Sequence, residues 1–140
     1  MSFNRNIVDD KSKEEVLALV SSQEFKDIFL KYNIDNVIIF GSLSTDKFNE
    51  ESDIDIAIIG SEKISSKLDL TLSLELEDFL GRSIDLIDIN DEDIENIIKI
   101  EALNSDMVIM KNEKYVYYDI LFKENIEFWN RLDKVVLESE

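Results

Sequence analysis

Residues 16–29 carry apolar side chains at the three- and four-residue spacing of a helix. Ser12 and Glu15 precede this stripe in the arrangement of a capping box, so we expect a helix to begin there. Ser21, Ser22 and Glu24 interrupt the stripe and would allow two helices. We expect one bent helix, followed by a turn over residues 31–36.

Short apolar runs rich in isoleucine and valine predict the strands of a sheet. The runs cover residues 37–40, 53–59 and 83–89, and a fourth run at 107–110 is expected to be an edge strand. The second run alternates apolar residues with aspartates, which is the two-residue period of a strand. The pattern therefore predicts a small sheet that carries acidic side chains at defined positions.

The apolar residues of the stretch 65–80 fit both the two-residue period of a strand and the period of a helix. Every second residue from 68 to 76 is a leucine, with other residues between, as in a strand, whereas the length, the good helix formers and Gly81 at the end favour a helix. We expect a helix whose main stripe consists of Leu68, Leu72, Leu76, Phe79 and Leu80. Leu70 and Leu74 then fall on the opposite side, where either another helix of this chain or a partner must cover them. We expect a helix of this chain.

Two further helices are expected in the last third of the chain. One covers residues 94–103, and a long helix extends from residue 111 to residue 136. The stripe of the long helix consists of Tyr118, Leu121, Phe122, Trp129, Leu132 and Val136. A hairpin with a strand at residues 115–118 is the alternative.

A glycine and a serine end the first strand. Gly41 lets the backbone turn tightly, and Ser42 is suited to cap a short helix after it. The free N–H groups at such a helix start can bind an anion such as phosphate. The sequence therefore predicts a phosphate cradle at Gly41 and Ser42.

Two aspartates begin the second strand. Asp53 and Asp55 share a face, with about 6.6 Å between their Cα atoms, while the isoleucines between and after them point into a core. Carboxylates side by side repel one another unless a cation lies between them. Hard oxygen ligands of this kind suit Mg²⁺, which usually binds substrate phosphates as well.

Gly41-Ser42, ten residues and then Asp53-Ile54-Asp55 resemble the G-S-x10-D-x-D signature of the DNA polymerase β nucleotidyltransferase superfamily. At this length the chain is most similar to the minimal nucleotidyltransferases, many of which are antitoxins encoded beside a HEPN-domain toxin. The resemblance runs from about Asn33 to the C-terminal helix. It implies a single-domain α+β fold, in which a small mixed sheet carries the acids on one face and helices cover the other.

The resemblance also implies a third carboxylate on an adjacent strand. Its context matches Ile84-Asp85-Leu86, so the role falls to Asp85. Period two puts Asp88 on the other face, where we expect it to belong to the strand exit. Arg82 lies near the expected site and would either reach a phosphate or, as we favour, form a surface ion pair.

The loop 43–52 departs from the family pattern. Many relatives carry an arginine just after Gly-Ser, whereas this loop offers Lys47 alone among three acidic residues. Phosphate is held best by charge-assisted donors, so we expect weak nucleotide binding.

Composition limits the function further. The 140 residues suit one domain, 1–140, with residues 1–11 frayed. The chain contains no cysteine and no histidine, which leaves carboxylates as the general bases. The net charge of −17 argues against direct nucleic-acid binding and favours a more basic partner, or serves solubility alone. No membrane helix or signal peptide is expected, so we expect a cytoplasmic protein.

The resemblance implies transfer of AMP from ATP to a hydroxyl, with a tyrosine of a cognate HEPN ribonuclease toxin as acceptor and the toxin as a stable partner. Asp53 and Asp55 would bridge two Mg²⁺ ions, and Asp85 would bind one of them and act as general base. Gly41 and Ser42 would hold the β- and γ-phosphates. Two alternatives stay open: an enzyme that modifies a small molecule, as aminoglycoside nucleotidyltransferases do, and an antitoxin that acts by binding without catalysis.

Overall fold

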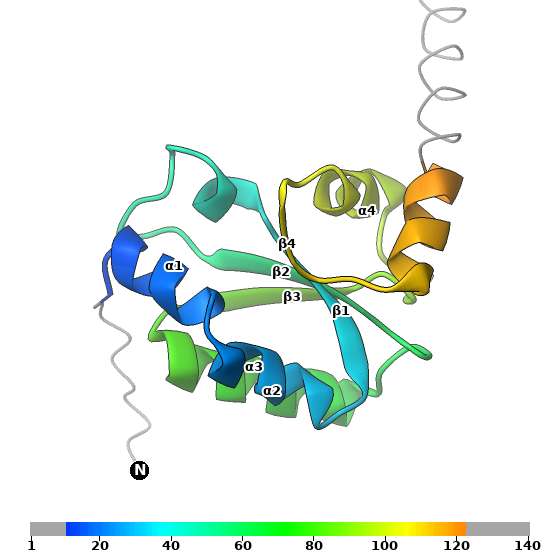
Figure 1. Ribbon diagram of the computed structural model, residues 1–140, viewed down its shortest axis with the longest axis horizontal. Helices are drawn as coiled ribbons and strands as arrows, with labels where there is room; N and C mark the ends of the chain where they lie inside the picture. The colour runs from blue at the N-terminus through cyan, green and yellow to red at the C-terminus, as the bar shows by residue number, and fades with distance from the viewer. Residues whose placement is uncertain (1–10, 123–140) are drawn as a thin grey trace, which may run out of the picture.

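A four-stranded sheet lies between two layers of helices in the computed structural model, which describes residues 11–122 (Figure 1). The expectation of a frayed start therefore lies outside the described residues, except for Lys11. The same holds for the last part of the long helix, with Trp129, Leu132 and Val136. Within residues 11–122, every helix is too short or too polar to cross a membrane.

Two helices, not one, open the described chain: α1 (Lys13–Val20) and α2 (Gln23–Leu30). The predicted capping box is confirmed, with the Ser12 side chain accepting from the Glu15 N–H and the Glu15 side chain accepting from the Ser12 N–H. The prediction of one bent helix is wrong. Ser22 adopts an extended conformation and accepts a hydrogen bond from the Phe25 N–H at 3.2 Å, so it begins a second helix.

The sheet contains β1 (Ile34–Phe40), β2 (Ile54–Gly60), β3 (Ile84–Asp88) and β4 (Met107–Met110) in the order β3-β2-β1-β4. β1 is antiparallel to both of its neighbours, and β2 is parallel to β3. This confirms the expected mixed sheet, with β4 at an edge. The parallel pair needs a crossover, and helix α3 provides it.

Helix α3 (Ser66–Leu80) confirms the helical prediction for this stretch. Ser65 caps its start, and Gly81 ends it in the left-handed conformation. Leu72, Leu76 and Leu80 are fully buried against the sheet. Leu70 and Leu74 are 63% and 48% exposed, so the expectation that a helix of this chain covers them is wrong for the described residues.

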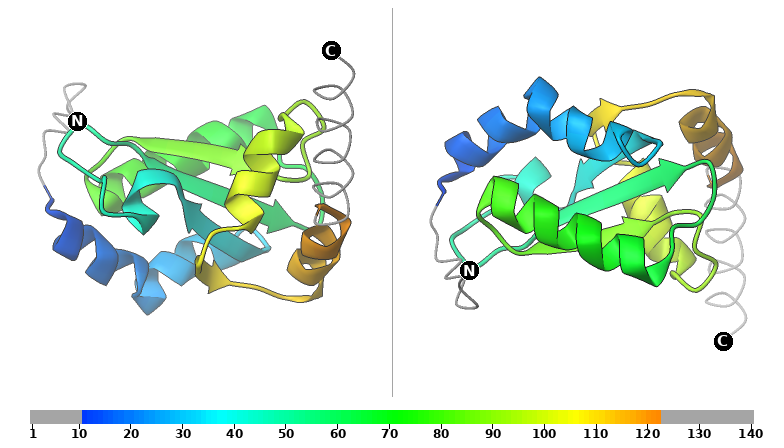
Figure 2. Two further views of the ribbon diagram at one scale, coloured as in Figure 1. Left: turned by 90° about the horizontal axis from the view of Figure 1, so that it is seen from above. Right: turned by 90° about the horizontal axis from the view of Figure 1, so that it is seen from below.

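Apolar residues cover both faces of the sheet. α1, α2 and α3 pack on one face, and α4 (Asn96–Leu103) crosses the other (Figures 1 and 2). Alternate strand residues divide between the two cores, for example Ile56 and Ile58 on the first face and Ala57 and Ile59 on the second. The expectation that helices cover only the face without the acids is therefore wrong, because the second face is apolar beyond the acidic end.

Residues 113–122 are helical, so the alternative of a hairpin at residues 115–118 is wrong. Tyr118 and Phe122 pack on the second core, and Tyr115 takes a buried place that the expected stripe lacked. Leu121, which the stripe included, is 38% exposed.

The two kinds of leucine on α3 predict different responses to substitution. Leu72→Ala should lower the free energy of unfolding by about 2–5 kcal/mol, because it leaves a cavity in the core. Leu70→Ser with Leu74→Ser should change it by less than about 1 kcal/mol, since both side chains already contact water. Urea denaturation of the purified variants measures both. A loss of several kcal/mol in the double serine variant would show that these leucines are core residues.

Candidate functional site

The end of β1 turns sharply at the Gly-Ser pair. Gly41–Ser44 form a single turn of 3-10 helix. Ser42 does not cap it, contrary to our expectation: the capping position is Phe40, and the Ser42 carbonyl accepts from the Thr45 N–H and hydroxyl at 3.0 and 2.9 Å. This leaves the Ser42 side chain in a cleft beside the turn.

Gly41 is in close contact with Asp55. The pairing of β1 with β2 places Phe40 opposite Asp55, so the next residue passes directly over the carboxyl group. A Cβ atom at position 41 would lie 2.0 Å from Asp55 Oδ2, and the φ of Gly41 is +72°. Both observations require a residue without a side chain.

The parallel pairing of β2 with β3 brings two acids together. Asp55 lies opposite Asp85, and adjacent strands are about 4.8 Å apart. Asp53 precedes β2 by one residue, and its negative charge is close enough to raise the pKa of Asp55. The three acids that the sequence singled out therefore gather at one end of the sheet.

Asp88 lies on the other side of β3 from Asp85 and is only 6% exposed. Its two carboxyl oxygens accept hydrogen bonds from the Ile64 and Asn90 N–H groups at 2.8 and 3.0 Å. Asp88 thus joins the segment before α3 to the exit of β3.

The pKa of Asp55 is raised from its ordinary 3.8 to about 6, first by burial and then by the negative charges of Asp85, Asp53 and Glu101. A hydrogen bond with Asp85 adds to the effect. The carboxyl groups therefore repel one another, and a proton or a cation would relieve the repulsion.

The carboxylate oxygens of Asp53, Asp55 and Asp85 are ligands of the kind that Mg²⁺ prefers. Within residues 11–122, however, no three acidic side chains already form a metal-binding cluster. The donor chemistry fits a divalent cation, and binding it would require these side chains to move.

A cleft of about 400 Å³ opens beside this acidic end, between the 3-10 turn and α4. Gly41, Ser42 and Lys47 line one side, and Glu101 and Asn104 of α4 and its cap line the other. Among residues 11–122, Lys47 is the one basic residue that lines it. Glu101 was not predicted from the sequence, because the spacing of a helical glutamate that lines a cleft is the same as that of one on an ordinary solvent-facing surface.

Arg82 is a structural residue of the loop beside the site. It is 5% exposed and donates to the Asn49 and Ser52 carbonyls at 2.6 and 2.7 Å. Its guanidinium lies 4.4 Å from the ring centre of Phe48. Both earlier interpretations, a phosphate ligand and a surface ion pair, are therefore wrong. Arg82 fixes the second half of the loop 43–52.

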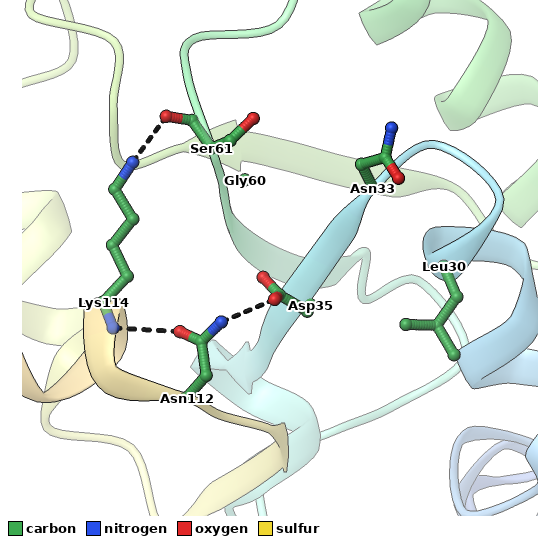
Figure 3. Close-up of a pocket in the computed structure, with 7 residues that line it drawn as sticks. All are labelled: Leu30, Asn33, Asp35, Gly60, Ser61, Asn112 and Lys114. Atoms are coloured by element: carbon green, nitrogen blue, oxygen red, sulfur yellow. Dashed lines mark hydrogen bonds between the residues drawn. The ribbon is translucent and has the colours of Figure 1, made fainter.

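A larger hollow of about 590 Å³ lies at the other end of β1 and β2 (Figure 3). Its polar groups are hydrogen-bonded to one another: Lys114 donates to the backbone carbonyl of Ser61 at 2.6 Å, and Asn112 donates to the Asp35 side chain at 2.5 Å. Ile34 pairs with Gly60 here, six residues along β1 from the Phe40–Asp55 pair. The hollow is far from the acids, so we place the candidate site at the three aspartates and in the smaller cleft, which they adjoin through the contact of Asp55 with Gly41.

The chain is similar in sequence to a known family and to a known protein. The family model described as polymerase beta, nucleotidyltransferase, matches residues 23–115. A protein of Methanocaldococcus jannaschii, provisionally named a protein adenylyltransferase, is 38% identical over 78 residues, which are 55% of this chain and 81% of that protein.

Two solved structures share the fold. A chain from a toxin–antitoxin crystal structure with AMP-PNP superposes with a TM-score of 0.66 at 17% identity, covering 84% of this chain and 98% of that one. A chain from the complex of tri-AMPylated Shewanella oneidensis HEPN toxin with MNT antitoxin gives 0.65 at 13% identity, covering 87% and 96%. At these identities the likeness concerns the fold alone.

The contact between Gly41 and Asp55 predicts that Gly41→Ala is costly. The left-handed backbone should cost about 1–2 kcal/mol, and displacing the carboxyl group about 1–3 kcal/mol more. Gly60→Ala is the matched control, since its Cβ would meet nothing closer than 3.6 Å. Urea denaturation compares the two variants. Equal losses of stability would contradict the close contact at position 41.

Proposed function

The chain belongs to the polymerase beta nucleotidyltransferase family, and we propose that it is a protein adenylyltransferase that acts as the antitoxin of a HEPN-type toxin. The observation that carries the proposal is the pairing of Asp55 with Asp85 directly beside Gly41. The carboxylates of Asp55 and Asp85 therefore lie beside the backbone of Gly41, which lines the cleft. A nucleotide's phosphates could enter there.

The proposed reaction transfers AMP from ATP to an acceptor hydroxyl. The hydroxyl oxygen forms a bond with the α-phosphorus, and the bond from that phosphorus to the bridging oxygen breaks, so that pyrophosphate leaves. The carboxylate of Asp85 takes the proton of the hydroxyl as general base. Ser42, by its hydroxyl, and Gly41, by its N–H, hold the β- and γ-phosphates.

Two Mg²⁺ ions would be held by Asp53, Asp55 and Asp85. When bound, Mg²⁺ supplies positive charge that offsets the triphosphate and the converging carboxylates. The raised pKa of Asp55 supports this assignment, because a carboxyl group in such surroundings gains most from a nearby cation.

The proposed acceptor is a tyrosine of the toxin. The support is the provisional name of the Methanocaldococcus relative, protein adenylyltransferase, together with the fold shared with a chain from the complex of an AMPylated HEPN toxin with its MNT antitoxin. The net charge of −17 would complement a more basic toxin. We place this pair in the cytoplasm, where ATP is available.

ATP should bind weakly. Lys47 is the one basic residue that lines the cleft in the part of the chain that the structure describes, and Asp46, Glu50 and Glu51 lie near it in the same loop. Carboxylates that are exposed to solvent are screened within about 8 Å at physiological salt, whereas charges at the reacting centre are not. We therefore expect an active enzyme with a raised KM for ATP.

The acidic loop also favours a second candidate function. An antitoxin that binds its toxin without modifying it would keep the fold and need no arginine in the loop 43–52. The experiment below distinguishes the two functions.

The test mixes the purified protein, the HEPN-type protein encoded next to its gene, ATP and Mg²⁺, and weighs the toxin by intact mass spectrometry. The wild type should add one or more AMP units. Asp53→Asn with Asp55→Asn should add none, and excess EDTA should prevent the reaction. Asp85→Asn should slow it by orders of magnitude.

Asp88→Asn is the comparison on the same strand, because it removes one carboxylate from the other side of the sheet; urea denaturation measures the stability that it loses with one of its two backbone hydrogen bonds. The substitution should leave the transfer rate nearly unchanged. If the wild type adds no mass at millimolar ATP, yet both it and the Asp53/Asp55 double variant neutralise the toxin equally, the catalytic proposal is wrong. The protein would then be the binding antitoxin.

A further inference from the structure

The C-terminal end of α4 faces the Gly41–Ser42 turn across the cleft, and it carries two polar side chains that the proposed reaction does not use. Glu101 and Asn104 line this wall. They are three residues apart in the helix and its cap, so they lie on the same side of it. Neither side chain makes a hydrogen bond or an ion pair with another residue in the range 11–122.

The other polar groups of the cleft are largely occupied. The Ser44 and Thr45 hydroxyls donate to the Gly41 and Ser42 carbonyls, and the Ser105 hydroxyl donates to the Ile39 carbonyl. The polar side chains left to bind a ligand are therefore those of Ser42 and Lys47 on one wall and of the α4 pair on the other, within the described residues.

The two walls suit different parts of a nucleotide. Lys47 and the Ser42 hydroxyl suit phosphate oxygens. Glu101 repels phosphate, and so does the negative end of the helix dipole at the end of α4. A carboxylate has only acceptors, so its natural partners are hydroxyl and amino donors. A nucleotide can thus satisfy both walls in one orientation, with its triphosphate at the turn and its nucleoside along α4.

We propose that Glu101 accepts hydrogen bonds from the ribose hydroxyls of the nucleotide and so makes the enzyme selective for ribonucleotides over deoxyribonucleotides. The inference rests on the proposed function and goes beyond it, since it assigns the sugar contact. Two carboxylate oxygens match the two neighbouring hydroxyls of a ribose, and an acidic residue has this role in other nucleotide sites. Asn104 adds an amide one helical turn away.

The competing role for Glu101 is that of a second proton acceptor, because its negative charge is close enough to Asp55 to raise the pKa of that carboxyl group. The two roles differ in a measurable way. A proton acceptor acts on every nucleotide alike, whereas a sugar contact acts only on a nucleotide that carries the hydroxyl groups.

The test measures binding of ATP, 2′-deoxy-ATP and 3′-deoxy-ATP to the full chain by isothermal titration calorimetry, with Mg²⁺ and without acceptor. The wild type should bind ATP about 10- to 100-fold more tightly than either deoxynucleotide, as expected for hydrogen bonds to a charged group. Glu101→Ala should reduce this preference to less than about threefold, and Glu101→Gln should keep part of it. Intact mass confirms that the protein itself stays unmodified.

Glu95→Ala is the matched control, because Glu95 lies at the other end of α4, is exposed and makes no side-chain cap. It should keep the full preference. An unchanged preference in Glu101→Ala, or equal weakening of all three nucleotides, would overturn the sugar contact and leave the proposed function standing. No binding of any nucleotide by the wild type, together with no AMP transfer, would overturn both.

Discussion

The parallel register of β2 and β3 is the constraint on which the site depends. It sets Asp55 opposite Asp85, and the antiparallel register of β1 and β2 sets Phe40 opposite the same aspartate. The Gly41 turn follows from the second pairing, because only glycine leaves room for the carboxyl group. A shift of either strand by one residue would turn the acids into the apolar core.

The rest of the molecule maintains this register against the repulsion of its carboxylates. Helix α3 carries the chain from β2 to β3, anchored by its buried leucines and by Ser65 and Gly81 at its ends. Asp88 bonds the start of that crossover to the exit of β3, and Arg82 bonds the loop before β2. These contacts lie outside the cleft, so the site can hold like charges together without any internal ion pair among the described residues.

Local patterns in the sequence were sufficient to predict most of the fold. Period two assigned Asp85 and Asp88 to opposite sides of β3, and helix formers with Gly81 identified α3 despite its alternating leucines. The spacing from Gly41 to Asp55 indicated the family. Features that depend on packing were not predictable: Ser22 begins a second helix, Arg82 turns inward onto Phe48, and Leu70 and Leu74 stay exposed. Glu101 enters the cleft only because α4 crosses the second face of the sheet.

The pKa of Asp55 tests the register most directly, because the negative charge of Asp85 on the paired strand is, after burial, the largest cause of its shift. A carbon-detected NMR titration of the side-chain carboxyl, without metal, should give a midpoint of about 6 in the wild type. Asp85→Asn removes one of the negative charges and should lower the midpoint toward 3.8, with burial keeping it above that value. Glu95→Gln, at the end of α4 far from the cleft, removes one exposed negative charge and should leave the midpoint unchanged. A midpoint that ignores Asp85→Asn would contradict the account.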